Sequence, residues 1–321
     1  MTYARREIFS PDESGFFHCI SRCVRRAFLC GYDRCSRKSF KHRKKWIKQR
    51  LYELIEIFAI ECLAYAVMSN HLHSILRNRP DIVALWSDRE VARRWRLLFP
   101  YRRSADGRPE EPDEEEIGRI VSSPQLVAKY RSRLSDISWF NRCLNEHIAR
   151  RANVEDDCSG RFWEGRFRSI RLETPEAVIA CSVYVDLNPI RAGKAQSLEE
   201  SDFTSIQDRI RALACTGSEG TPKLVAPVEV ANLHDFTPQR YIELVRETGR
   251  MLVDQKHSLP AHLLSTLKLL GIRPEGWVEN ARNHETLFHR VMGPVRALRS
   301  FASRKNRAWL CGLSSARLLF A

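Results

Sequence analysis

Two histidines separated by one leucine, His71-Leu72-His73, form the first pattern in the chain that could do chemistry. They follow an apolar run that ends in a polar break at Ser69 and Asn70. In a β-strand alternate side chains point to opposite faces, so both histidines would share one face while Leu72 enters the core. Two imidazoles on one face can bind one divalent ion. Ten histidines in 321 residues also make a chance pair common, so a metal site and two unrelated histidines both remain open.

A tyrosine and an amide, Tyr184 and Asn188, form the second pattern. Thr174 followed by proline is a good helix start, and the helix should end near Leu187 because Pro189 disfavours helical geometry at the residue before it. Residues four apart lie on the same side of a helix, so the phenol and the amide would project together. As an alternative, the tyrosine packs at the helix end and the amide caps it.

Arginines and aromatic residues alternate over residues 161–171, which hold four arginines and three aromatic side chains. This mixture suits phosphate pairing and base stacking on single-stranded nucleic acid. It also fits an ordinary strand with aromatic residues in the core and arginines on the surface. The candidate nucleic-acid contacts here are Arg161, Phe162, Trp163, Arg166 and Arg168.

The net charge is +14, and much of it lies near the start of the chain. Residues 1–50 hold fourteen Lys and Arg against four Asp and Glu, which gives 14 − 4 = +10. A polyanionic partner such as nucleic acid is the simplest interpretation, with a solvated basic face as the alternative. Three of these lysines lie at a predicted helix start, where the helix dipole disfavours cations, so an external anion would explain them. The candidate phosphate contacts are Arg22, Arg25, Arg26, Lys44, Lys45 and Lys48.

Several protein classes are excluded by what the sequence lacks. No stretch approaches the ~18 apolar residues of a membrane span, and the first residues do not resemble a signal peptide, so we expect a cytoplasmic protein. Ten cysteines are scattered, and the early group lacks the two-residue spacing typical of zinc knuckles. We interpret them as reduced thiols, several of them buried as small apolar residues.

Hydrophobic periodicity predicts the order β-α-β-β for the first part of the chain, with strands near 16–22, 61–68 and 71–76. A helix over 81–99, a mobile acidic loop over 104–116 and helices from Pro124 and over 136–152 should follow. The division that this pattern indicates is a domain over 1–214, a linker over 215–222, and a helical accessory domain over 223–321.

Three segments occur together in an order that resembles the single-tyrosine HUH transposases, specifically the insertion-sequence-200-like enzymes and their REP-associated tyrosine transposase branch. The segments are Met68-Ser69-Asn70-His71-Leu72-His73, Gly160-Arg161-Phe162-Trp163-Glu164-Gly165-Arg166-Phe167 and Tyr184-Val185-Asp186-Leu187-Asn188-Pro189-Ile190-Arg191-Ala192-Gly193. The resemblance covers roughly residues 10–210. It implies an α+β fold with an antiparallel sheet flanked by helices in a ferredoxin-like arrangement. Here the fold would carry a helical insertion at about 81–135, which short members of the family lack, and a mainly helical C-terminal region.

The resemblance also implies roles. His71, His73 and Asn188 would hold a divalent ion, Mg²⁺ or Mn²⁺. Tyr184 would attack a phosphate of single-stranded or hairpin DNA and form a 5′-phosphotyrosine link, with Arg191 among the DNA contacts. Such a protein would associate with the nucleoid, and a homodimer is possible because the family holds both monomers and dimers.

Two alternatives stay open beside this interpretation. Another HUH endonuclease, of the replication-initiator or relaxase type, would use the same site chemistry. A domesticated nucleic-acid-binding protein without catalysis would use the basic surface alone, although binding would not need the histidine pair and the tyrosine.

Overall fold

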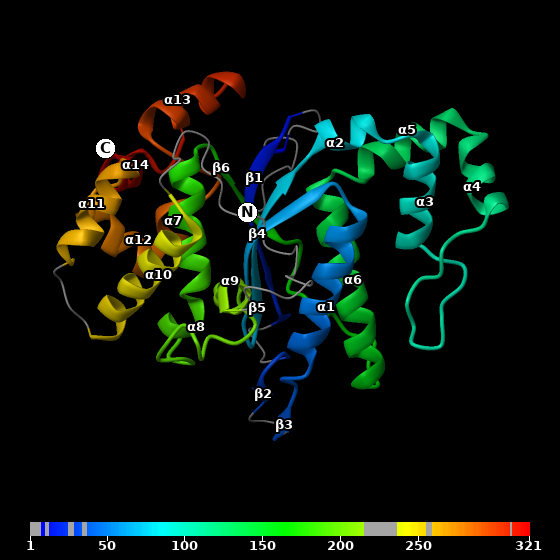
Figure 1. The fold of residues 1–321 in the computed structure, drawn as a ribbon, viewed down its shortest axis with the longest axis horizontal. Coiled ribbons are helices and arrows are strands. Elements are labelled where there is room, and N and C mark those ends of the chain that lie inside the picture. Colours follow the sequence, from blue (N-terminus) through cyan, green and yellow to red (C-terminus); the bar gives the residue numbers. More distant parts are fainter. Residues whose placement is uncertain are drawn as a thin grey trace.

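A five-stranded sheet forms the centre of the computed structural model, which describes residues 8–9, 13–24, 29–33, 37–214, 236–254, 259–308 and 310–321. The strand order is β4-β5-β1-β6-β7 (Figure 1). The strands are β1 (Gly15–Arg22), β4 (Ile60–Val67), β5 (His71–Asn78), β6 (Arg168–Leu172) and β7 (Val291–Met292). A separate two-stranded ribbon consists of β2 (Tyr32–Asp33) and β3 (Lys38–Ser39).

The first four strands of the sheet confirm the predicted antiparallel arrangement. β1 pairs antiparallel with both β5 and β6, and β4 pairs antiparallel with β5. Numbered in chain order, these strands lie 4-1-3-2 across the sheet, which is the ferredoxin-like order. The sheet as a whole is mixed, because β7 lies parallel to β6. Two residues give no periodic signal, so β7 could not be predicted from the sequence.

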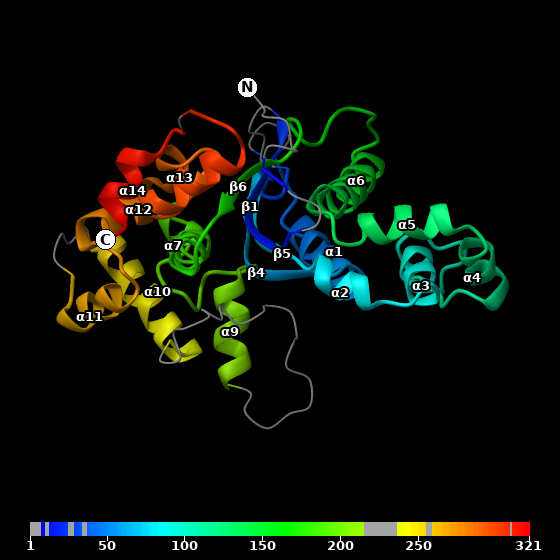
Figure 2. The ribbon, with the colours of Figure 1, turned by 90° about the horizontal axis from the view of Figure 1, so that it is seen from above.

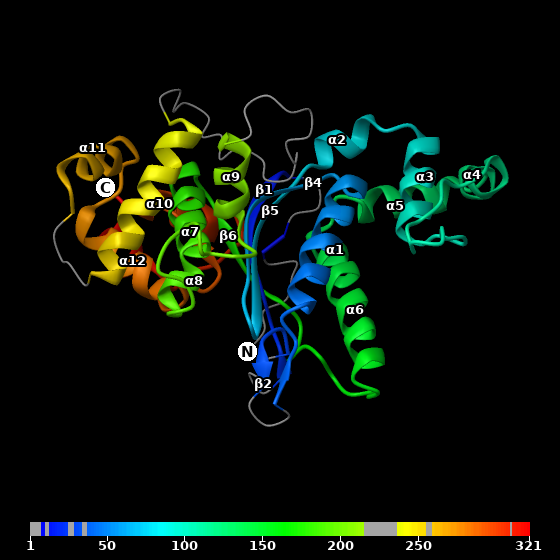
Figure 3. The same cartoon turned by 60° about the horizontal axis from the view of Figure 1, so that its bottom comes forward.

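Strand alternation gives the sheet two different faces. One face carries Phe17, Leu72 and Leu76, which join the core under α1 (Arg43–Ile57) and α6 (Ile137–Glu155). The opposite face contributes Ile75 and Ile170 to the core around α7 (Pro175–Asp186). Figures 1 and 3 show α1 and α6 on one side of the sheet and α7 on the other. A side chain's parity along its strand therefore decides which layer it faces.

The α7 helix begins and ends close to its predicted bounds. The Thr174 hydroxyl accepts a hydrogen bond from the amide of Ala177, and proline follows the cap. After α7 the chain forms one more turn, α8 (Asn188–Arg191). The sheet covers one side of α7 and later helices cover the other, so nearly every residue of the helix is buried.

The insertion differs from its prediction in two places. The helix predicted over 81–99 is divided into α2 (Pro80–Leu85) and α3 (Asp88–Leu98), because the Ser87 hydroxyl caps a new helix start. The predicted acidic loop is shorter, since a capping box begins α4 (Glu114–Val121) within it. Its acids pair with arginines of the insertion itself, as in the Arg89–Glu114 ion pair. The fourth helix of the insertion is α5 (Pro124–Arg133).

The C-terminal region packs on the outer side of α7 (Figure 2). Its helices, with the one that precedes the predicted linker, are α9 (Ser205–Ala214), α10 (Pro238–Val253), α11 (Ala261–Leu269), α12 (Pro274–Leu287), α13 (Val295–Arg304) and α14 (Leu313–Leu319). The predicted linker over 215–222 lies outside the described residues. The described C-terminal part shares one hydrophobic core with α7 and supplies β7 to the sheet.

A buried aspartate ties these layers together. The carboxylate of Asp186 accepts hydrogen bonds from the Ser205 hydroxyl, from the Ile206 amide at 2.9 Å and from the Tyr241 hydroxyl at 2.6 Å. It therefore joins the end of α7 to α9 and α10. No helix among the described residues combines the length and apolar character needed to cross a membrane.

Gly276→Ala should separate α12 from α14. A Cβ at this position would lie 2.3 Å from the Leu318 carbonyl oxygen and 2.4 Å from the Leu319 Cα, and backbone atoms cannot rotate away. We expect the free energy of unfolding to fall by about 1–3 kcal/mol, measured by urea denaturation. Gly118→Ala is the matched control, because nothing lies within 4 Å of a Cβ added there. Alanine also has a higher helix propensity than glycine at this exposed position of α4. Equal effects of the two substitutions would contradict this packing.

Candidate functional site

His71 and His73 lie on the same face of β5, with their ring centroids 4.9 Å apart. Leu72 between them is buried in the opposite core, as strand alternation predicts. His71 is half-buried at the start of the strand, whereas His73 is fully buried. The face that carries them is the one covered by α7.

Hydrogen bonds engage Nδ1 of both rings, which leaves Nε2 of each ring as the nitrogen available to a metal. His71 Nδ1 lies 2.7 Å from the side-chain oxygen of Asn70, which can only accept, so Nδ1 carries the hydrogen and Nε2 keeps its lone pair. His73 Nδ1 lies 2.9 Å from His18 Nε2, and His73 Nε2 is buried without a hydrogen-bond partner. In the tautomer in which His73 Nδ1 donates to His18, the Nε2 of His73 carries a lone pair too. Metal-ligating histidines typically have this arrangement.

Burial keeps both imidazoles neutral. Loss of hydration lowers the pKa of His71 to about 4, and the charge of Arg22 adds to this shift. Burial also lowers the pKa of His73 well below its usual value. Neutral imidazole is the form that binds metal, so neither ring would have to lose a proton at neutral pH.

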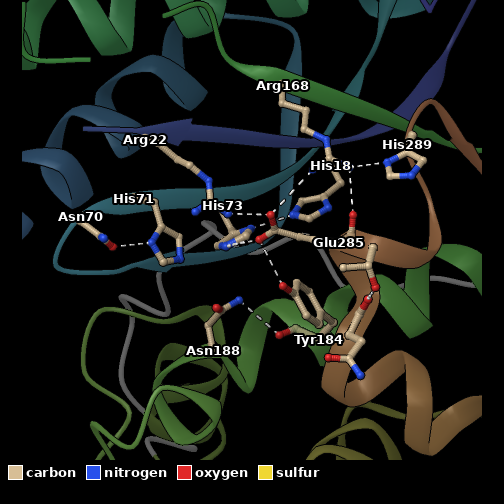
Figure 4. Close-up of polar contacts among 12 residues, drawn as sticks. His18, Arg22, Asn70, His71, His73, Arg168, Tyr184, Asn188, Glu285 and His289 are labelled. Carbon is tan, nitrogen blue, oxygen red and sulfur yellow. Dashed lines mark hydrogen bonds and ion pairs between the residues drawn. The ribbon is translucent and has the colours of Figure 1, made fainter. Parts of the chain in front are cut away.

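Tyr184 projects from the last turns of α7 toward the histidines (Figure 4). Its ring centroid lies 5.9 Å from that of His73. The hydroxyl donates to Glu285 Oε1 at 3.2 Å and accepts from Arg191 Nη2 at 3.1 Å. Burial raises the pKa of Tyr184 to about 12, although the Arg191 charge opposes this shift. The phenol therefore keeps its proton at neutral pH and needs activation before it can act as a nucleophile.

Asn188 lies beside Tyr184, as the four-residue spacing predicts. Its side-chain nitrogen donates to the Tyr184 carbonyl at 3.3 Å, and its oxygen accepts from Arg191 at 3.4 Å. The Asn188 side chain also lies close enough to His71 to oppose the fall in its pKa. The structure thus brings together the three residues predicted as metal ligands and the predicted nucleophile.

Glu285 occupies the middle of this group and was missed by the sequence analysis (Figure 4). Its Oε1 faces the Tyr184 hydroxyl and lies 3.7 Å from His73 Nε2. Its Oε2 lies 2.6 Å from Arg22 and 3.7 Å from Arg168. A lone glutamate in a C-terminal helix carries no motif, and only the packing of α12 against α7 places it here.

A second group of possible ligands lies behind Tyr184. The ligand atoms of His18, Cys181 and His284 all lie within 4.8 Å of one another, and all three residues are fully buried. His284 donates from Nδ1 to Asn280 at 2.9 Å, and its Nε2 lies 3.4 Å from the Cys181 sulfur. Imidazole and thiol together suit zinc, whereas imidazole with amide or carboxylate oxygen suits Mn²⁺ better. The sequence could have indicated His18, because it lies in the predicted first strand, where alternation assigns each side chain to one face of the sheet.

The predicted nucleic-acid contacts are placed differently from one another. Arg22, Arg168 and Arg191 all reach the site. The prediction that Phe162 stacks on a base is wrong. The residue is only 3% exposed and its ring is covered in the core beneath α1 and α6. Trp163 is half-buried and donates its indole hydrogen to the Asn145 carbonyl at 2.8 Å. Arg161 and Arg166 are exposed.

The basic residues of the first fifty also differ in placement. Lys48 pairs with Asp208 at 2.6 Å, so an internal carboxylate already satisfies it. Lys44 is half-buried with its ammonium 5.8 Å from the Phe203 ring centroid, and Lys45 is exposed. Arg25 and Arg26 lie outside the described residues.

The fold and the site define an α+β protein with ferredoxin-like strand order. One of its strands presents a histidine pair to a tyrosine on α7, the helix that follows the fourth strand. No family model and no curated protein matches the chain. A solved structure described as a REP-associated tyrosine transposase bound to a REP hairpin is similar, with 13% identity over 74% of this chain and 96% of that one. Its TM-score is 0.39.

Proposed function

We propose that the protein is a metal-dependent tyrosine transposase that nicks and rejoins single-stranded, hairpin-forming DNA. The observation that carries the proposal is the convergence of Tyr184 with a neutral histidine pair, in which the His73 ring lies 5.9 Å from that of Tyr184 and keeps an unpartnered Nε2. This constellation provides a nucleophile and a metal-binding position within one chain. It adds to the resemblance of the three sequence segments.

The donor set fits a divalent cation. His71, His73 and Asn188 would hold Mg²⁺ or Mn²⁺, and the ion would supply Lewis-acid polarisation of a phosphate oxygen. Two imidazoles and one amide oxygen leave positions open for phosphate and water. The unpartnered Nε2 of buried His73 supports this assignment, because a buried polar atom without a partner is costly.

Tyr184 would carry the covalent step. Its oxygen attacks the phosphorus, the bond to the 3′ oxygen breaks, and the phenolic proton is released while the 3′ oxygen gains a proton. The product is a 5′-phosphotyrosine and a free 3′-hydroxyl. This link conserves the energy of the phosphodiester, so a 3′-hydroxyl can reverse the step for strand transfer. Arg191 bonds the phenolic oxygen and would stabilise negative charge on it.

The charge distribution supports DNA as the partner. Arg191 donates to the tyrosine hydroxyl, and Arg22 and Arg168 contact Glu285 beside it. Arg161 and Arg166 are exposed on the segment before β6. Arginine pairs well with phosphate oxygens. Since the histidines and Tyr184 belong to one chain, the site does not need a second copy, and a homodimer would serve assembly on DNA. Such a protein would work in the cytoplasm at the nucleoid.

Incubation with end-labelled hairpin DNA and Mn²⁺ tests this function. We expect a protein–DNA adduct that survives denaturation and disappears with EDTA. A second oligonucleotide with a free 3′-hydroxyl should then be joined to the labelled strand, whereas simple nicking without joining favours another type of HUH endonuclease. DNA binding without an adduct under any divalent ion would support the non-catalytic alternative instead.

A further inference from the structure

The Glu285 carboxylate lies where cationic and hydrogen-bonding groups of the site converge. Arg22 and Arg168 contact one of its oxygens, and the Tyr184 hydroxyl donates to the other. We propose that this position is the subsite for the scissile phosphodiester, and that Glu285 closes the subsite until DNA displaces it. This inference rests on the proposed function and assigns both the phosphate position and its regulation.

The distances place the carboxylate where a reacting phosphate must be. Attack by Tyr184 requires a phosphorus atom about 3–3.5 Å from the phenolic oxygen. Glu285 Oε1 lies 3.2 Å from that oxygen and 3.7 Å from His73 Nε2, which would bind the metal. The second carboxylate oxygen is held by guanidinium groups, as a non-bridging phosphate oxygen would be. Two anions cannot occupy this volume together.

The contacts also argue against a role as proton acceptor. Burial raises the pKa of Glu285, but the neighbouring cations, Arg22 foremost, outweigh burial and hold it below its usual value. The pKa of Tyr184 is about 12. A carboxylate so much less basic than the phenolate accepts a proton poorly. An anion held by arginines is therefore the better description of this group.

Glu285 can leave the subsite without unfolding the region around it. Its side chain is 20% exposed and that of Arg22 is 35% exposed, so water reaches the pair and weakens it. The preceding His284 is anchored through Asn280 and Cys181, and the α12 break at Asn283 fixes the direction of this last turn. Rotation of the glutamate side chain alone would free the arginines for phosphate.

Glu285→Gln tests the proposal, with Glu275→Gln as the matched control. Both changes remove one negative charge from α12, but Glu275 is exposed in its first turn, away from the site. Affinity for a fluorescent single-stranded oligonucleotide is measured by anisotropy in EDTA. We expect Glu285→Gln to bind roughly fivefold to tenfold more tightly than the wild type, and Glu275→Gln to differ by less than about twofold. With Mn²⁺ the Glu285 variant should also form adduct faster.

A second variant guards against misfolding as an explanation. Glu285→Asp keeps the charge but shortens the side chain, so its affinity should lie between those of the wild type and Glu285→Gln, with all melting curves cooperative. Equal DNA affinity of Glu285→Gln and Glu275→Gln would overturn the proposal, and so would loss of Mn²⁺ binding in Glu285→Gln, which would make Glu285 a ligand. The EDTA experiment needs no cleavage. Tighter binding without any adduct would therefore refute the nuclease function but still support a phosphate-binding subsite that Glu285 closes.

Discussion

Tyr184→Phe should abolish the covalent DNA adduct and leave DNA binding within about twofold of the wild type. The substitution removes one oxygen atom. The ring keeps its stack on His284, with centroids 4.6 Å apart, and its contact with the Arg191 guanidinium, 3.9 Å from the ring centroid. Without the oxygen no phosphorus–oxygen bond can form, so adduct formation should fall by at least about 10³-fold on denaturing gels.

Tyr130→Phe is the control for this result. Tyr130 stacks on Trp95 in the insertion, with ring centroids 3.9 Å apart, and belongs to the layer on the other side of the sheet. Its variant should form adduct at the wild-type rate. An adduct that persists in Tyr184→Phe would make the nucleophile assignment wrong, and mass spectrometry of the DNA-linked peptide would then identify the residue that carries the phosphate.

Local signals were enough to predict the elements that carry His71 and Tyr184. Strand alternation depends only on backbone pleating, so the shared face of the histidine pair followed from their spacing. The start of α7 followed from the capping hydroxyl of Thr174 and the proline after it, because capping acts within one turn. These rules hold before any tertiary contact forms.

Tertiary packing decided the features that the sequence did not reveal. Glu285 lies 101 residues after Tyr184, and β7 consists of two residues, so neither leaves a periodic pattern. Phe162 shows the opposite error: an arginine-rich neighbourhood suggested a stacking platform, whereas the ring completes the core beneath α1 and α6. Composition cannot separate a buried aromatic residue from an exposed one when both alternate with arginine.

His71→Ala should remove most Mn²⁺ binding and nearly all adduct formation. The substitution deletes one of the two imidazoles proposed to bind the ion. His71 lies at a half-buried strand end and is not part of the hydrophobic core, so loss of the ring leaves that core intact. Removal of a group that only orients a ligand typically costs 10–100-fold in metal affinity, so loss of a ligand itself should exceed about 100-fold. Isothermal titration calorimetry with Mn²⁺ measures the affinity without requiring turnover.

Two further variants show where the ion binds. His262→Ala removes an exposed imidazole from α11 and should leave the titration unchanged. Cys181→Ser removes the thiol of the buried group formed with His18 and His284. If the ion is held by His71 and His73, Cys181→Ser keeps Mn²⁺ affinity and adduct formation. The reverse outcome, with binding lost in Cys181→Ser and retained in His71→Ala, would show that the ion binds to the group of His18, Cys181 and His284 instead. There it would contact the covered side of the nucleophile, and the histidine pair would have to act on DNA without it.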